Sequence, residues 1–235
     1  MRIGITRHAA SLAALIQQGM ESGFEIIPLP VTEIKMIPFT WPEELQTEAP
    51  NWIIFTSANA VDAFFTRLDE LKIKIPYTTK YAAISDKTSD SLRIKGHQVS
   101  LQSFKPYGDS LFQALTKDIL QAGDVVAYPR AKKIVNDPEM MFKQAEIKYF
   151  PIICYQTDTS FLDNTLAERF EKKDFILFTA PSAVNSYHQQ YGVPVAQLVA
   201  IGNTTAEQMS ALGWQNISIL PRPDINQILE YVKCQ

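Results

Sequence analysis

The chain has 235 residues, of which 46% are hydrophobic and 20% charged, and its formal net charge is −3. This composition is typical of a folded globular protein and excludes an intrinsically disordered chain. It contains no apolar run near the roughly 18 residues that a membrane span needs, and its start lacks the pattern of a signal peptide. Its basic residues are scattered, which argues against a nucleic-acid-binding surface.

The two cysteines, Cys154 and Cys234, have neither metal-ligand spacing nor the number that a disulfide framework requires. The sequence therefore predicts a protein of a reducing cytoplasm, with no metal site, no membrane contact and no nucleic-acid partner.

Short apolar runs rich in Ile, Val, Phe and Tyr alternate with amphipathic segments along the chain, which indicates a parallel α/β architecture. The runs predict ten strands, near residues 2–6, 24–29, 52–56, 81–84, 98–101, 124–128, 147–151, 175–179, 198–201 and 217–220. Helices are predicted between most of them, for example over "SLAALIQQGM", "NAVDAFFTRLDEL", "DSLFQALTKDIL" and "TLAERFEKK".

One phrase occurs twice, as "IIFTSANAVDAFF" from Ile53 and as "ILFTAPSAVNSYH" from Ile176. The match extends through the next strand and helix, where Gly96 and Gly213 both follow a predicted helix and suit a left-handed backbone. A weaker similarity links "RIGITR" with "VVAYPR". This duplication predicts two similar domains of five strands each. From the residues alone, the halves are either sequential or interleaved, with the second domain inserted into the first.

Hydroxyl side chains follow two strands in each copy, immediately before a helix. They are Thr56 and Ser57 before Asn59, and Thr179 before Ser182; the next turns are "ISDKTSD" and "IGNTTAE", with Gly202, Thr204 and Thr205 in the second. A helix start offers unpaired backbone N–H groups and a favourable dipole for an anion, although each hydroxyl alone also suits an N-cap. Turns of this kind gather at the carboxyl ends of parallel strands, where open α/β folds bind ligands, and predict an anion site.

Arg7 and Arg130 each end a strand and are candidates for carboxylate binding, with a surface ion pair as the alternative. Tyr155, in "CYQTD", is a candidate for a phenol that faces the ligand, with a packing role as the alternative. The histidines His8, His97 and His188 are dispersed, and we assign none of them acid-base chemistry. The sequence contains no serine-hydrolase elbow and no phosphate-binding glycine loop.

Taken together, "WIIFTSANAVDAFF", "FILFTAPSAVNSY", "LVAIGNTTAEQMSALGW", "RIGITR" and "CYQTD" resemble the uroporphyrinogen-III synthase family over essentially the whole chain. The resemblance implies two flavodoxin-like or Rossmann-like α/β domains, one inserted in the other, joined by a two-stranded linker. It places one domain at residues 1–32 and 158–235 and the inserted domain at 37–152, with linkers at 33–36 and 153–157.

The resemblance also implies a reaction. Members of the family close the linear tetrapyrrole hydroxymethylbilane into uroporphyrinogen III, with loss of water, inversion of ring D through a spiro intermediate, and no cofactor. A cytoplasmic monomer is expected, with a transient contact to the enzyme of the preceding step. Because the substrate supplies its own reactivity and carries eight carboxylates, we expect positioning to dominate over side-chain acid-base power.

By the same resemblance, Tyr155 is the proton donor to the departing hydroxyl. The residues expected to bind substrate are Arg7, Thr56, Ser57, Asn59, Ser182, Gly202, Thr204 and Thr205. The chain departs from the family at Ser85 to Ser89, where the family often has Gly followed by Thr-Ala, and Asp86 would repel a carboxylate there. It also lacks the glycine usual before the strand at Ile147.

Two other interpretations remain open on the residues. A two-domain α/β module that binds an anionic small molecule without catalysis would have the same architecture. A nucleotide-binding enzyme is the other, although neither G-x-G-x-x-G nor G-x-x-x-x-G-K-[ST] occurs in the sequence.

Overall fold

A computed structural model describes residues 1–103, 108–162, 166 and 169–235. The chain forms two compact units. Unit 1 comprises residues 1–33 and 157–235, and unit 2 comprises residues 34–156. The second unit is therefore inserted into the first, which decides between the sequential and the interleaved arrangement.

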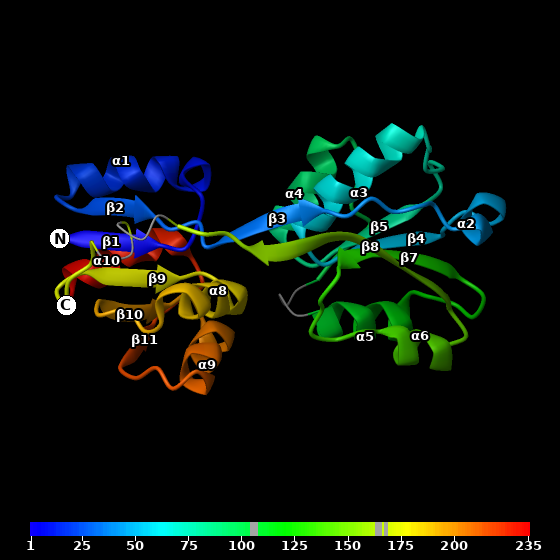
Figure 1. The fold of residues 1–235 in the computed structure, drawn as a ribbon. Coiled ribbons are helices and arrows are strands. Elements are labelled where there is room, and N and C mark those ends of the chain that lie inside the picture. Colours follow the sequence, from blue (N-terminus) through cyan, green and yellow to red (C-terminus); the bar gives the residue numbers. More distant parts are fainter. Residues whose placement is uncertain (104–107, 163–165, 167–168) are drawn as a thin grey trace. The chain divides into compact units, whose positions relative to one another are not determined.

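Unit 1 is built on a parallel sheet with the strand order β11-β10-β9-β1-β2 (Figure 1). Its strands are short, and all but the edge strand β11 are mostly buried: β1 (Arg2–Ile5), β2 (Glu25–Pro28), β9 (Phe175–Phe178), β10 (Gln197–Ala200) and β11 (Ile217–Ile219). The pairing of Gly4 in β1 with Ile176 in β9 joins two parts of the chain that lie far apart in sequence. Strands buried on both faces explain why these segments are nearly continuous apolar runs.

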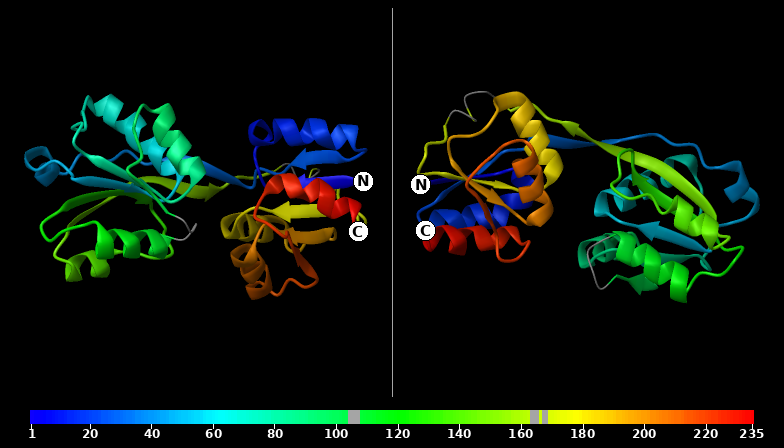
Figure 2. Two further views of the ribbon diagram at one scale, coloured as in Figure 1. Left: turned by 180° about the vertical axis from the view of Figure 1, so that it is seen from behind. Right: turned by 90° about the horizontal axis from the view of Figure 1, so that it is seen from below.

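Helices cover both faces of this sheet (Figure 2). The short η1 (Ala9–Leu12), α1 (Ala13–Glu21) and α10 (Ile228–Lys233), which follows η2 (Ile225–Gln227), pack against Ile3, Ile5 and Leu177 on one face. The other face packs against α8 (Pro181–Tyr191) and α9 (Asn203–Ala211). Alternate strand residues thus feed two cores, as the two-residue period of a strand requires.

Unit 2 repeats this design with the strand order β3-β8-β7-β4-β5-β6. Its strands are β3 (Thr32–Met36), β4 (Trp52–Phe55), β5 (Lys80–Ala83), β6 (Leu101–Gln102), β7 (Val125–Ala131) and β8 (Lys148–Thr159). One face packs against α2 (Glu43–Thr47), α3 (Ala58–Leu71) and α4 (Asp86–Ile94), and the other against α5 (Gly108–Asp118) and α6 (Glu139–Gln144).

The two sheets have equivalent strands in equivalent places. The run β6-β5-β4-β7-β8 corresponds to β11-β10-β9-β1-β2, so equivalent strands of the two copies have the same neighbours in their sheets. Numbered in chain order, unit 1 has the flavodoxin-like order 2-1-3-4-5, and the five matching strands of unit 2 have the order 3-2-1-4-5 that begins a Rossmann fold. The predicted fold class is confirmed. Gly96 and Gly213 both take positive φ, at 86° and 78°, as predicted.

Some strand predictions were wrong in detail. The run near 98–101 forms only the two-residue β6, and unit 2 has a sixth strand, β3, that apolar periodicity did not indicate. β3 forms because β8 continues to Thr159 and offers it a hydrogen-bonding partner, as in the bond from Ile37 N–H to the Cys154 carbonyl at 2.9 Å. Of the predicted helix over "TLAERFEKK", residues 165, 167 and 168 lie outside the described ranges, and residues 169–173 form no helix, so the prediction was wrong for that part.

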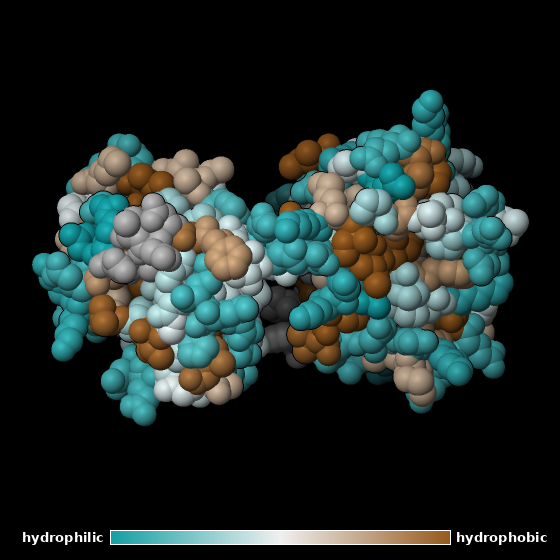
Figure 3. Space-filling model, viewed as in Figure 1, coloured by the Kyte–Doolittle hydropathy of each residue, from teal (hydrophilic) through white to brown (hydrophobic). Residues whose placement is uncertain are grey.

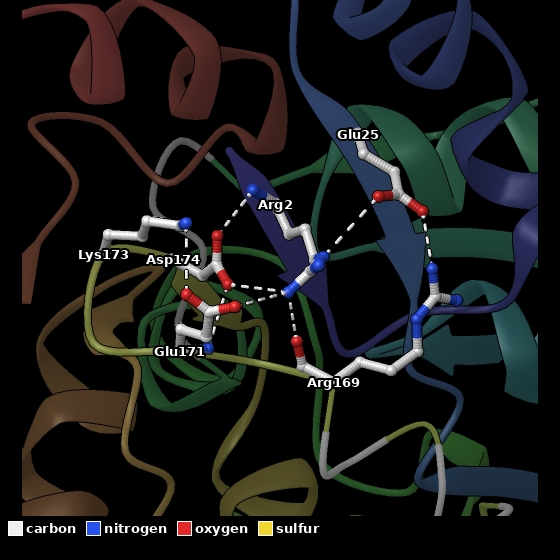
Figure 4. A network of polar contacts seen from close by, with 6 residues as sticks. All are labelled: Arg2, Glu25, Arg169, Glu171, Lys173 and Asp174. Atoms are coloured by element: carbon white, nitrogen blue, oxygen red, sulfur yellow. Dashed lines mark hydrogen bonds and ion pairs between the residues drawn. The ribbon is translucent and has the colours of Figure 1, made fainter.

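A polar network holds the amino ends of the unit 1 strands (Figure 4). The side chain of Asp174, which is fully buried, accepts hydrogen bonds from the backbone N–H groups of Arg2 (2.8 Å) and Glu171 (2.9 Å), and the Arg2 guanidinium lies 3.4 Å away. Arg2 also lies 3.7 Å from Glu25, which pairs with Arg169 at 2.9 Å. The network therefore ties β1 and β2 to the segment that enters β9.

Within the described residues, no helix is long and apolar enough to cross a membrane. On the face shown in Figure 3, hydrophobic residues lie in separate patches among hydrophilic ones in each unit. Large exposed apolar side chains such as Tyr77, Val135 and Phe161 are likewise distributed along the chain. Single exposed apolar residues of this kind are ordinary on a protein surface.

Candidate active site

Two hydroxyl pairs form at the carboxyl end of β4 in unit 2. Thr56 Oγ1 lies 2.9 Å from the Tyr128 hydroxyl, and Ser57 Oγ lies 2.9 Å from the Tyr155 hydroxyl. Thr56 and Ser57 follow β4, while Tyr128 and Tyr155 belong to β7 and β8. β4 and β7 flank the point where the strand order reverses, which is where open α/β sheets place ligands.

Ser57 has two structural roles. It is the N-cap of α3, with an extended backbone, and its Oγ accepts a hydrogen bond from Ala60 N–H at 3.1 Å. Because that bond uses only one lone pair, the Ser57 hydroxyl can still donate its own proton to the Tyr155 oxygen. In that arrangement the Tyr155 proton is left for a ligand.

Tyr155 is nearly buried, with 8% of its surface exposed. Burial raises the pKa of the phenol, a hydrogen bond with Ser57 acts in the opposite direction, and the neighbouring Cys154 adds a smaller upward effect. The net shift is upward, so the phenol is protonated at neutral pH. Tyr155 is therefore suited to donate a proton, and Ser57 is placed to stabilise the oxygen that the proton leaves.

A cavity of about 200 Å³ lies at these hydroxyls, entirely within unit 2. Thr56, Tyr128 and Tyr155 contribute to its wall, together with Lys133 and Asn136 of the segment that follows β7. Backbone N–H of Lys132 donates to the Tyr155 carbonyl at 2.8 Å, which fixes this segment beside β8. The wall of the cavity thus includes three hydroxyl-bearing residues and the exposed residue Lys133.

In the second turn of unit 2, at Ser85 to Ser89, the chain departs from the family pattern, and the polar side chains bond to one another and to Gln102. Ser85 Oγ lies 3.2 Å from Thr88 Oγ1, Ser89 Oγ donates to the Gln102 side-chain oxygen at 2.6 Å, and the Gln102 amide donates to Asp86 at 2.7 Å. Thr88 and Ser89 are buried. Asp86 lies at the first position of α4, where its charge complements the helix dipole.

Unit 1 has a different arrangement at the corresponding strand ends. Thr179 N–H donates to Thr6 Oγ1 at 2.9 Å, and Thr179 Oγ1 donates to the Thr6 carbonyl at 3.0 Å, so this hydroxyl pair links β1 to β9. Next to it, Arg7 is partly buried, and burial lowers the pKa of its guanidinium. No ion pair of the Arg7 guanidinium occurs with the described residues.

The starts of α8 and α9 in unit 1 have no side-chain caps. Ala180 precedes α8 and Gly202 precedes α9, and neither has a side chain that accepts a hydrogen bond from the helix N–H groups. Ser182 and Thr204 are exposed in the first turns of these helices, whereas Thr205 is only 1% exposed and lies in the interior. Thr204 therefore has access to a ligand that the Thr205 side chain lacks.

Asn59 is exposed in the first turn of α3, whereas Arg130 and the three histidines have local partners. Arg130, 14% exposed at its side chain, lies 3.6 Å from Asp137 and donates to the Ala131 carbonyl. His97 stacks on Phe65 at 4.3 Å, His188 accepts from Trp214 Nε1 at 3.0 Å, and His8 contacts the Thr32 carbonyl.

Cys154 precedes Tyr155 but is not a nucleophile in this environment. Its thiol is buried, lies 3.6 Å from the Arg130 carbonyl, and has a pKa that burial raises to about 12. The described residues contain no group of three or more His, Cys, Asp or Glu side chains arranged for a metal ion.

Tyr128 is the site residue that sequence reasoning missed. In the sequence it lies within the apolar run "VVAY", where a core position explains it fully. The signal that could have found it is its place at the last position of the predicted strand 124–128, because a tyrosine there combines an apolar ring with a polar hydroxyl.

This architecture defines a class: a two-unit α/β protein with hydroxyl groups, helix starts without side-chain caps and a buried tyrosine near strand ends of two duplicated sheets. The sequence profile of the uroporphyrinogen-III synthase HemD family matches residues 12–230. The chain belongs to this family and is an enzyme of the uroporphyrinogen-III synthase type, as the sequence predicted.

Solved structures agree with the fold. The chain is similar to uroporphyrinogen-III synthetase from Helicobacter pylori, with 23% identity, a TM-score of 0.70, and coverage of 100% of this chain and 99% of that one. It is also similar to a mutant uroporphyrinogen III synthase from Thermus thermophilus, with 16% identity, a TM-score of 0.62, and coverage of 100% and 98%. Both similarities extend over both units.

Proposed function

We propose that the chain converts hydroxymethylbilane into uroporphyrinogen III with Tyr155 as the proton donor. The observation that carries this proposal is the 2.9 Å contact between the Tyr155 and Ser57 hydroxyls at a cavity beside the switch point of unit 2. Hydroxymethylbilane is the substrate that the family implies.

The first step breaks the bond between the terminal methylene carbon and its hydroxyl oxygen. Tyr155 gives its proton to that oxygen, which leaves as water, while the lone pair of the pyrrole nitrogen supplies the electrons and produces an electron-poor azafulvene. Ser57 stabilises the resulting phenolate by donating a hydrogen bond. The proton lost when the pyrrole ring becomes aromatic again restores the phenol, so protons balance over the cycle.

The remaining steps require positioning more than further acid-base groups. Attack by the substituted carbon of ring D gives the spiro intermediate, which fragments and closes with the ring inverted. The substrate must be held in one conformation for this to happen, because the linear chain also closes without inversion to the type I isomer. Thr56 and Asn59 in unit 2, and Arg7, Ser182, Gly202 and Thr204 in unit 1, are the groups that we assign to its carboxylates.

The proposal agrees with the charge of these groups. The uncapped starts of α8 and α9 offer backbone N–H groups to carboxylates, and Arg7 adds a cation that lacks an internal partner among the described residues. A protein with a net charge of −3 can therefore bind a polyanion through local donors. Thr205, although predicted as a ligand, is only 1% exposed, so we do not assign it to a carboxylate.

The test is an assay with freshly prepared hydroxymethylbilane, in which the type I and type III isomers are separated by chromatography after oxidation. Wild-type protein should form type III in proportion to its concentration. Tyr155→Phe should lower the rate of type III formation about a hundredfold, within the range that a general acid contributes. Tyr149→Phe on the same strand is the matched control and should retain full activity.

Two outcomes would contradict the proposal. Full activity of Tyr155→Phe would exclude the proton-donor role. Formation of type I alone by folded wild-type protein would exclude ring inversion by this chain and favour a module that binds the tetrapyrrole without catalysis.

A further inference from the structure

Tyr128 occupies a position whose structural role needs no hydroxyl. The strand registers pair Ile53 with Ala127 in unit 2 and Ile176 with Gly4 in unit 1, and Ile53 and Ile176 open the two copies of the repeated phrase. Tyr128 therefore corresponds to Ile5. Ile5 is fully buried, and Tyr128 is 2% exposed, so both fill a core position. The difference between the two positions is the phenolic oxygen, which Tyr128 has and Ile5 lacks.

That oxygen is directed to Thr56. The two oxygens are 2.9 Å apart, and both residues line the cavity that also contains Tyr155. Burial raises the pKa of Tyr128, while the hydrogen bond with Thr56 and the charge of Arg130 act in the opposite direction. The net shift is upward, so Tyr128 is a neutral phenol at physiological pH.

The proton count of the pair is informative. Thr56 and Tyr128 together carry two hydroxyl protons, and one of them lies in the bond between their oxygens. The other proton remains available to a group in the cavity. In unit 1, the corresponding Thr179 hydroxyl donates to the Thr6 carbonyl, so its proton is already used within the protein.

We infer that Tyr128 is a positioning residue: it fixes the Thr56 hydroxyl so that the pair presents one proton to the substrate beside Tyr155. The inference rests on the proposed function and goes beyond it, because it assigns specificity to a residue that contacts Thr56 through one hydrogen bond. A Thr56 side chain without this bond would lose its fixed orientation, and more substrate would dissociate and close to the type I isomer.

The test is a double-mutant cycle built from Tyr128→Phe and Thr56→Val, which remove the hydroxyls and keep most of the shape. Each single variant should lower kcat/KM for type III formation about fivefold, the scale of one net hydrogen bond. If Tyr128 acts through Thr56, the double variant should be no slower than either single variant. Tyr149→Phe is the matched control, because its ring lies beside that of Tyr128 while its hydroxyl bonds Asp137.

Losses that multiply in the double variant would overturn the inference, because they would mean that the two hydroxyls act independently. Unchanged kcat/KM in Tyr128→Phe would overturn it as well. Thermal unfolding of each variant separates these outcomes from misfolding, and we expect the midpoint of Tyr128→Phe to stay close to that of Tyr149→Phe. Failure of this cycle leaves the Tyr155 proposal standing, since Tyr155→Phe tests that proposal in the unaltered Thr56 and Tyr128 background.

Discussion

The two units share one topology but differ at the carboxyl ends of their strands. In unit 2, Ser57 caps α3 and contacts Tyr155, and Tyr128 contacts Thr56. In unit 1, the residue aligned with Ser57 is Ala180, which caps nothing, and the threonines are bonded to each other. The two copies therefore share the strand-turn-helix structure but differ in the polar groups at its turn. Unit 2 has paired hydroxyls suited to proton transfer, and unit 1 has helix starts without side-chain caps, which suit anions.

The largest expected effect concerns the amino ends of the unit 1 strands. The proposed site residues of this unit lie at the opposite, carboxyl ends. Asp174→Asn should lower the free energy of unfolding by about 3 kcal/mol, because it leaves the Arg2 guanidinium without its buried carboxylate. A urea titration measures the loss. Glu171→Gln is the control, since that side chain is 58% exposed and should cost well under about 1 kcal/mol. Equal losses in the two variants would contradict the buried-network interpretation.

The same carboxylate predicts a pH dependence. Burial alone would raise the pKa of Asp174, but hydrogen bonds from the Arg2 and Glu171 N–H groups, with the charges of Arg2 and Lys173, bring it below its ordinary value of 3.8. A lowered folded-state pKa stabilises the fold above the unfolded-state pKa, and this contribution is lost as the pH falls through the folded-state value. The acid unfolding of Asp174→Asn should therefore be less steep than that of wild type.

Ser57→Ala makes unit 2 resemble unit 1. It removes the hydrogen bond to Tyr155 and the cap of α3, so we expect kcat to fall about tenfold and stability to fall by about 1 kcal/mol. Ser182→Ala, at an exposed position of α8, should change both by much less. The isomer assay and a thermal melt measure the two effects. A loss of stability without a loss of kcat would leave Ser57 as a cap alone.

Ala180→Ser makes unit 1 resemble unit 2. Ala180 already has the extended backbone of an N-cap, so a serine there should stabilise α8 by about 1 kcal/mol. By occupying the N–H groups that we assign to a substrate carboxylate, it should also raise KM about threefold and leave kcat nearly unchanged. An unchanged KM with a raised melting temperature would show that this helix start does not bind substrate.

The smallest effect is expected at the second turn of unit 2, where the amide of Gln102 holds Asp86. Gln102→Ala should lower stability by about 1 kcal/mol, because Ser89 and Asp86 lose their partner. It should leave KM within about twofold of wild type, because one lost hydrogen bond in a turn that we place outside the substrate site does not alter substrate contacts. A large rise in KM would place this turn in the substrate site after all.

Much of the fold could be predicted from the sequence. Apolar runs and helical periodicity gave most strands, and the repeated phrase at Ile53 and Ile176 gave two similar units, because those signals are local. Periodicity could not predict the short β6 or the strand β3, since a strand of low apolar content forms only when a partner is adjacent. The family resemblance did imply β3, as one strand of the two-stranded linker. The family resemblance, rather than periodicity, indicated the inserted topology that the pairing of β1 with β9 displays.

Part of the candidate site could likewise be predicted from the sequence, and part could not. Sequence indicated Tyr155, the hydroxyl turns and the open helix starts, because residue type and position in a strand-turn-helix unit are local properties. Only the tertiary structure decided that Tyr128 meets Thr56, 72 positions away, and that Ser57 meets Tyr155, 98 positions away. It also separated exposed Thr204 from buried Thr205. Hydrogen bonds and burial depend on which strands become neighbours, and strand pairing is a property of the whole sheet that no local pattern encodes.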